Sequence, residues 1–150
     1  MKVLTQNVAE ISVSYKVTDR IKPSVHTSSD VYHELVHWFP EDIIALQELF
    51  VVAYLNRSNK IIGVYQVSKG GITGTVADPR LILATGLKIA ATGMILAHNH
   101  PSGSLRPSKQ DEDLTKKIKQ GALFMDMQVL DHLILSPDGE YFSFADEGLI

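Results

Sequence analysis

Two histidines, His98 and His100, are separated by one residue and follow an apolar run, MILA, at positions 94–97. In an extended chain, side chains two residues apart point to the same side, so both imidazoles could reach one metal ion. Further along the chain, Asp111 could add a carboxylate oxygen and leave a fourth coordination position open for water. The chain contains no cysteine, so a transition-metal site must use nitrogen and oxygen ligands. The spacing therefore predicts a His-His-Asp metal site.

The same residues also have structural interpretations. The two histidines could be loop residues that hydrogen-bond to backbone carbonyls. Ser108 and Asp111 have the spacing of a capping box, which alone would explain both residues at the start of a helix. An Asp111 oxygen that accepts a capping hydrogen bond is less available to a cation. A zinc–oxygen distance of about 2.0–2.2 Å would identify the metal-binding role.

A second pattern, H-E-x-x-H at residues 33–37, is typical of zinc sites on helices. At about 100° per residue, its two histidines lie opposite Val31, Leu35 and Trp38, which would form the buried side of the helix. A catalytic zinc needs a sheltered cleft and a third protein ligand. We therefore predict that this pattern is a solvent-exposed helix face.

The elements that must position the histidines and carboxylates alternate between strand and helix patterns. Strands are predicted at residues 11–17, 48–55, 61–67, 94–97, 129–135 and 141–144, and helices at 29–39, 79–92 and 108–123. This order predicts an α/β fold in which helices flank a mixed β-sheet. The length predicts a single domain, 1–150, with the strand and helix of residues 1–41 packed on the remainder.

Composition excludes several classes of function. With 45% hydrophobic and 21% charged residues, the chain has the composition of a soluble globular protein. The longest apolar stretch, 81–97, is too short to span a membrane and contains Lys88. The net charge of −3 lacks the basic excess of nucleic-acid-binding domains. We expect a cytoplasmic protein without a membrane partner, the charge argues against a nucleic-acid partner, and the oligomeric state stays open.

The spacing H-x-H-x7-S-x2-D, formed by His98, His100, Ser108 and Asp111, resembles the JAMM motif of JAB/MPN metalloprotease domains. The string LAHNHPSGSLRPSKQDEDLT at residues 96–115 is similar to the RadC branch of that family. Further similar segments are ELF at 48–50, DPR at 78–80 and VLDHLI at 129–134. The resemblance covers roughly residues 42–150.

The resemblance implies a JAB/MPN-like architecture, similar to the cytidine deaminase fold, with one zinc ion at the end of a central strand. Its ligands would be His98, His100 and Asp111. The upstream glutamate of the family matches Glu48, which would orient the attacking water and take its proton, and the motif serine, Ser108, would stabilise the oxyanion. The implied reaction is hydrolysis of a peptide or isopeptide bond in an unidentified peptide or protein substrate.

Asp131 and His132 also fit the family pattern, although no ligand role follows from it. We expect the pair either to support the metal ligands from behind or to hydrogen-bond within the core, and we favour the core role.

Three other functions compete with hydrolysis. A DNA-repair or mobile-element accessory protein would bind nucleic acid without peptidase activity. The family name favours it, but Arg80, Arg106 and Lys109 are too few for a phosphate track. A metal-binding domain that has lost its activity is the second alternative. The third, a zinc deaminase, is excluded because its cysteine ligands are missing.

Overall fold

A computed structural model describes residues 8–18, 21–71 and 76–150. Within these residues a five-stranded sheet has the strand order β2-β1-β3-β4-β5. β3 and β4 are parallel, and the other neighbouring strands are antiparallel. The strands are β1 (Leu49–Leu55), β2 (Ile61–Lys69), β3 (Gly93–Asn99), β4 (Gln128–Leu135) and β5 (Tyr141–Ser143). The predicted mixed sheet is confirmed.

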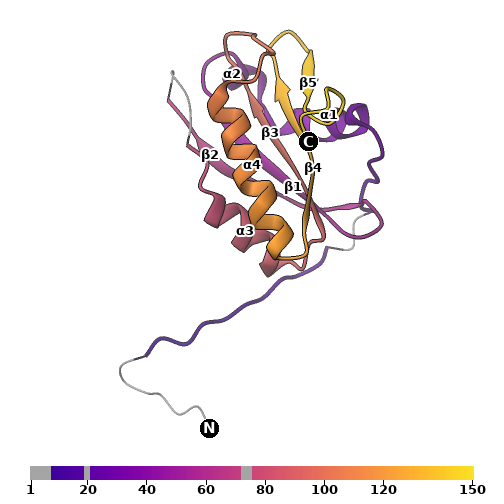
Figure 1. Ribbon diagram of the computed structural model, residues 1–150, viewed down its shortest axis with the longest axis vertical. Coiled ribbons are helices and arrows are strands. Elements are labelled where there is room, and N and C mark those ends of the chain that lie inside the picture. The colour runs from indigo at the N-terminus through magenta and orange to yellow at the C-terminus, as the bar shows by residue number, and fades with distance from the viewer. Residues whose placement is uncertain (1–7, 19–20, 72–75) are drawn as a thin grey trace.

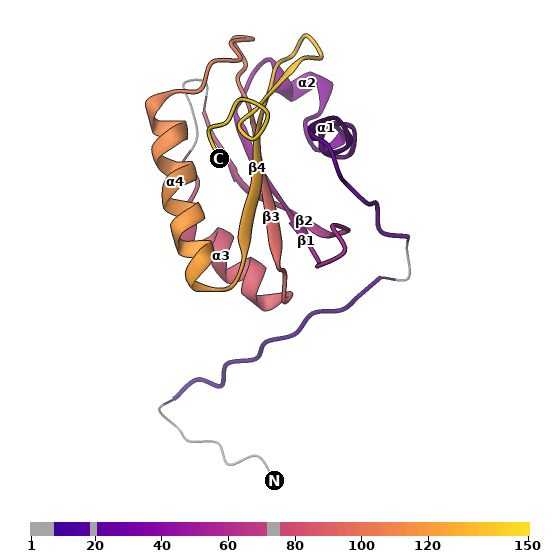
Figure 2. The ribbon, with the colours of Figure 1, turned by 45° about the vertical axis from the view of Figure 1, so that its right-hand side comes forward.

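Helices cover both faces of the sheet (Figures 1 and 2). On one face lie α3 (Pro79–Lys88) and α4 (Lys109–Phe124). On the other lie α1 (Ser28–Leu35), the 3₁₀-helix η1 (Val36–Trp38) and α2 (Glu41–Ile44). This arrangement confirms the predicted α/β class. None of the described helices has both the length and the apolar character that crossing a membrane requires.

The central strand β3 is buried along its whole length, and its side chains alternate between two apolar clusters. Ile95 and Ala97 belong to the cluster on the α1 side, whereas Met94 and Leu96 belong to the cluster on the α3 and α4 side. Because this alternation has a period of two, His98 continues the second set. The strand therefore places the His98 side chain on the face of the sheet that α3 and α4 cover, where α4 begins.

The prediction of a strand at residues 11–17 is wrong. No strand forms in residues 8–18, and this segment extends away from the domain (Figure 1). Its alternating apolar side chains remain exposed, 87% for Ile11 and 71% for Val13. The helical part of residues 1–41 does pack on the sheet, through Val31 and Leu35. The parts of this segment at 1–7 and 19–20 lie outside the described residues.

Two of the predicted helices end at other residues than the sequence pattern predicted. The helix predicted at 29–39 is α1 followed by the separate turn η1, and α2, which was not predicted, follows after Pro40. α3 ends at Lys88 rather than at residue 92. Ala90 has a φ of 54°, and the backbone N–H of Ala91 bonds to the Gly86 carbonyl. A left-handed residue of this kind ends a helix because the next turn cannot continue.

Candidate metal centre

Four potential metal ligands converge at the carboxyl end of β3. They are Glu48 just before β1, His98 near the end of β3, His100 in the following loop and Asp111 in the first turn of α4; one ligand atom of each lies within 4.8 Å of the others. His98 Nε2 and His100 Nε2 are 3.0 Å apart, and each lies 3.3 Å from an Asp111 oxygen. Glu48 Oε1 is 4.0 Å from His98 Nε2. The structure thus brings the three predicted ligands together with the predicted base.

Strand pairing explains why residues so far apart in the sequence meet here. β1 is antiparallel to β3, and Phe50 pairs with His98, so the start of β1 lies beside the end of β3. The residue before β1 is Glu48, which places its carboxylate at the same sheet edge. The loop after β3 is held by the His100 N–H, which donates to the Leu135 carbonyl at the end of β4.

Hydrogen bonds behind His98 determine which of its ring nitrogens carries the hydrogen. Thr115 Oγ1 donates its hydrogen to the Asp111 carbonyl at 2.6 Å, so it must accept from His132 Nδ1, also at 2.6 Å. His132 is neutral because burial lowers its pKa, and its Nε2 therefore accepts from His98 Nδ1 at 2.8 Å. In the neutral His98 ring, Nε2 is then the nitrogen without a hydrogen, and its lone pair faces the cluster.

His100 reaches the same state through a backbone contact. Its Nδ1 lies 2.8 Å from the Ser104 carbonyl oxygen, which can only accept, so Nε2 is left unprotonated in the neutral ring. Two lone pairs that face each other across 3.0 Å repel unless a cation lies between them. The hydrogen bond with Asp111 raises the pKa of His100, so a proton on its ring competes with a metal ion for the same position. Metal binding would release that proton. Two imidazole nitrogens with carboxylate oxygens fit the donor set of zinc.

One carboxylate oxygen of Asp111 accepts the capping hydrogen bond, and the other lies outside the capping box. Oδ2 accepts the capping hydrogen bond from the Ser108 N–H at 2.8 Å and faces His100, whereas Oδ1 faces His98. Ser108 Oγ in turn accepts from the Asp111 N–H at 3.0 Å, which completes the predicted capping box. Burial opposes ionisation of Asp111, but hydrogen bonds with the two histidines outweigh it and lower the pKa of the carboxyl group. Asp111 is therefore a carboxylate with one oxygen outside the capping box.

Glu48 has a different electrostatic environment. Burial raises the pKa of its carboxyl group, although the positive charge that the two histidines can carry acts in the opposite direction. Its side chain is 18% exposed, so it retains contact with solvent. A half-buried carboxylate of this kind holds a proton more readily than a surface glutamate does.

Asn99 fixes the backbone on both sides of Glu48. Its Oδ1 accepts from the Leu49 N–H at 2.7 Å, and its Nδ2 donates to the carbonyls of Ile44 and Gln47, each at 2.8 Å. The side chain is fully buried. Sequence reasoning missed this role. The available signal was the position of Asn99 directly after His98 in the strand pattern, which points its polar side chain to the opposite face.

Replacing Asn99 by leucine should lower the free energy of unfolding by about 3 kcal/mol, because three buried backbone groups lose their partner. Urea unfolding of Asn99→Leu against the unmodified chain measures this difference. The control is Gln128→Leu at the exposed start of β4, which should change stability by no more than about 0.5 kcal/mol. Equal unfolding free energies for the two variants would contradict the role of Asn99.

The structure separates the predicted pair Asp131 and His132. His132 is fully buried and hydrogen-bonds to Thr115 and to His98, so in this residue the favoured core role and contact with a predicted ligand coincide. Asp131 points to the other face of β4, where it accepts from Ser143 Oγ at 2.7 Å and from the Ala145 N–H at 3.0 Å. It therefore fixes the segment after β5 as a core hydrogen-bonding residue.

Thr115, which sequence reasoning also missed, lies one turn after Asp111 on α4, and this spacing was its signal. Thr115→Val keeps the shape but removes the hydroxyl that orients His132, so zinc affinity should fall about 10- to 100-fold. Thr115→Ser restores the hydroxyl and should retain the affinity. Competition with a chromophoric chelator measures both variants. Equal affinity of the valine and serine variants would show that the hydroxyl does not act on the site.

The H-E-x-x-H pattern is exposed, as predicted. His33, Glu34 and His37 all face solvent, and His37 lies in η1 rather than in α1. Across the described ranges, the cluster around His98 is the one group of three or more potential ligands with atoms this close together.

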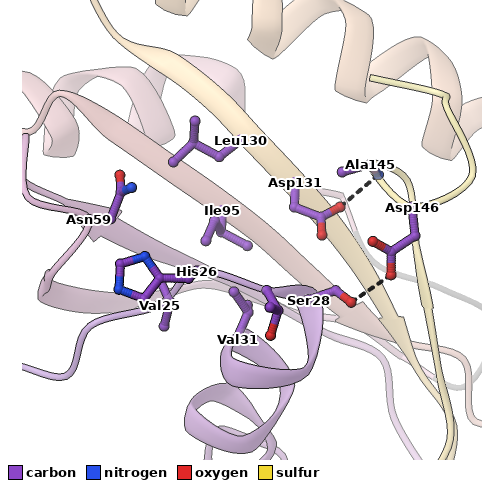
Figure 3. A pocket seen from close by; sticks show the side chains of 11 residues that line it. Val25, His26, Ser28, Val31, Asn59, Ile95, Leu130, Asp131, Ala145 and Asp146 are labelled. Atoms are coloured by element: carbon purple, nitrogen blue, oxygen red, sulfur yellow. Dashed lines mark hydrogen bonds between the residues drawn. The ribbon is translucent and has the colours of Figure 1, made fainter.

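A cavity of about 460 Å³ lies away from this cluster, between α1 and β4 (Figure 3). Asp131 and Asp146 line it, and the hydrogen bonds drawn there tie Asp131 to Ala145 and Asp146 to Ser28. None of the four clustered residues lines it. The candidate metal centre is therefore a separate site on the opposite face of the sheet.

Comparison with known proteins places the fold and the cluster in one family. The sequence model of the RadC-like JAB domain matches residues 25–149, so the similarity begins earlier than the predicted residue 42. A UPF0758 protein of Flavobacterium johnsoniae is 53% identical over 102 residues, which cover 68% of this chain and 44% of that protein. A UPF0758 protein of Streptococcus gordonii is 40% identical over 129 residues, which cover 86% of this chain and 54% of that protein.

A third UPF0758 protein, from Porphyromonas gingivalis, is 49% identical over 104 residues, covering 69% of this chain and 46% of that protein. The chain spans about half the length of the curated relatives it matches. The mixed five-stranded sheet flanked by helices is consistent with a JAB domain. The family match covers most of the chain, including every residue of the metal cluster. The chain belongs to the RadC-like JAB domain family.

Proposed function

We propose that this chain is a zinc-dependent hydrolase of peptide or isopeptide bonds. His98, His100 and Asp111 would hold the zinc ion, and Glu48 would act as the base. One observation carries the proposal: the Nε2 atoms of two histidines face each other at 3.0 Å beside two carboxylates. Structural histidines in a loop would instead direct both ring nitrogens to backbone or solvent.

A zinc ion held by these residues would lower the pKa of a bound water molecule toward neutrality and polarise a carbonyl group. Glu48 lies at the edge of the cluster, 4.0 Å from His98 Nε2, where its carboxylate can accept a proton from water and pass it to the leaving amine. The raised pKa of Glu48 favours this transfer, since a base with a pKa closer to neutrality holds the proton longer.

Ser108 would stabilise the negative charge that develops on the carbonyl oxygen. Its Oγ already accepts the capping hydrogen bond from Asp111, which fixes the oxygen and leaves the hydroxyl hydrogen available to donate. Contacts of this kind contribute about 2.7–4 kcal/mol in other enzymes. Ser108 is thus proposed as an oxyanion donor and Asp111 as a ligand, within one capping box.

The function is tested with the purified chain on a library of linear and isopeptide-linked peptides, with and without zinc. We expect cleavage by the zinc-loaded protein that a chelator abolishes and added zinc restores. Absence of cleavage by the zinc-loaded protein would overturn the hydrolase assignment. A gel shift with DNA that weakens steeply with salt would then support the accessory-protein alternative.

A further inference from the structure

The segment of residues 8–18, called the arm below, has the side-chain pattern of a strand without a partner. Apolar and polar residues alternate along it with a period of two, the pattern of a strand with one buried face. The apolar members are 41–87% exposed; they are Ile11, Val13, Tyr15 and Val17. In both ribbon views the arm extends away from the domain (Figures 1 and 2). Its apolar face therefore lacks a covering surface in its own molecule.

The sheet has an open edge that could receive this strand. Among the described residues, β2 ends the strand order and has one sheet neighbour, β1. Its outer side carries an isolated bridge at its start, where Ser24 pairs with Lys60. Open sheet edges present unpaired N–H and C=O groups that readily pair with another strand. β2 is also long enough, since its nine residues exceed the seven of the alternating segment 11–17.

The surface beside this edge holds a groove with several apolar side chains. The groove has a volume of about 370 Å³ and runs between η1 and the first half of β2, and Ile62, Val64 and Trp38 line it together with Lys22, Glu34 and Thr18 of the arm. Trp38 is 43% exposed, which is high for a large aromatic side chain. The arm already makes one contact at this edge, because the Tyr15 hydroxyl donates to the Ile62 carbonyl at 3.0 Å. An arm strand on β2 would therefore bring its apolar face beside this groove.

We propose that the arm of each chain adds as a further strand to the outer edge of β2 in a second copy, so that two chains exchange arms. The chain is tied to the start of its own β2, where the Ile61 N–H donates to the Pro23 carbonyl at 2.9 Å, and the arm then leaves the domain. Apart from the Tyr15 hydrogen bond to Ile62, the arm runs away from its own domain and so can reach a neighbour (Figures 1 and 2). Because each copy supplies one arm and one edge, the exchange closes as a two-fold symmetric dimer.

The first experiment measures mass by light scattering coupled to size exclusion, and we expect a dimer. The double variant Ile11→Lys/Val13→Lys places charges on the apolar face and should be monomeric, with an unchanged thermal melting curve. The matched control Ser12→Lys/Ser14→Lys places the same charges on the polar face and should remain dimeric. A monomeric unmodified chain, or a dimer that persists in Ile11→Lys/Val13→Lys, would overturn the proposal.

The second experiment identifies the acceptor edge and uses the absence of native cysteines. Chains carrying Ser12→Cys, Ser14→Cys or Lys16→Cys are each mixed with chains carrying Gln66→Cys on β2 and oxidised. We expect a disulfide-linked heterodimer for at least one arm position. Linkage only between two arms would indicate arm-to-arm pairing. Chains that carry both an arm cysteine and Gln66→Cys are oxidised alone in parallel. Linkage only within such single chains would indicate that the arm covers its own β2, and either result would overturn the proposal.

Discussion

Glu48→Gln should lower peptide hydrolysis by about 100- to 10,000-fold while zinc binding is retained. Glutamine has nearly the same shape, but its neutral amide cannot accept the proton that hydrolysis releases from water. The ligand set of two histidines and Asp111 remains intact in this variant. The measurement is kcat on a peptide cleaved by the unmodified chain, together with zinc content per chain.

The matched control is Glu34→Gln in the exposed H-E-x-x-H pattern of α1, which should leave both activity and zinc content unchanged. Unchanged hydrolysis by Glu48→Gln would remove this residue from the mechanism. Loss of activity in Glu34→Gln would instead assign the role of the base to Glu34, on the other face of the sheet.

His98→Gln should reduce bound zinc from one ion per chain to essentially none. His98 is central to the cluster because its Nε2 faces His100 and Asp111 while its Nδ1 is held by His132. Glutamine provides no imidazole nitrogen, and its amide nitrogen has no lone pair available to a metal. Mass spectrometry of the folded protein after zinc loading measures the stoichiometry directly.

The control for this prediction is His37→Gln, which changes the same residue type in the competing pattern. His37 is exposed on η1, so this variant should bind zinc as the unmodified chain does. Zinc loss in His37→Gln with retention in His98→Gln would assign the metal to the H-E-x-x-H pattern. Retention in both variants would contradict the proposed zinc centre.

The sequence pattern predicts the parts of this site that depend on local geometry. The i, i+2 spacing of His98, at the end of β3, and His100, just after it, places both rings on one side, and the Ser108–Asp111 capping box starts α4 beside them. Glu48 is different, since it reaches the site through the antiparallel register of β1 and β3. That register depends on contacts between distant segments, so only the family resemblance could select Glu48 among the carboxylates.

The residues that sequence reasoning missed also depend on distant partners. Asn99 bonds to backbone groups about fifty positions earlier in the chain, and Thr115 acts on His132 of another element. The strand predicted at 11–17 shows the opposite case. Its period of two is clear in the sequence, but a strand forms only where an edge receives it. Periodicity reports a preferred conformation and an apolar face, and it does not identify the partner.

If His98, His100 and Asp111 hold a zinc ion as proposed, the ion must lie between them. Anomalous diffraction at the zinc absorption edge, from crystals of the zinc-loaded chain, locates it. We predict one peak about 2.0–2.2 Å from His98 Nε2, His100 Nε2 and an Asp111 oxygen, with Glu48 beside it. A peak at His33 and His37, or no peak at the cluster from crystals that contain zinc, would contradict the account.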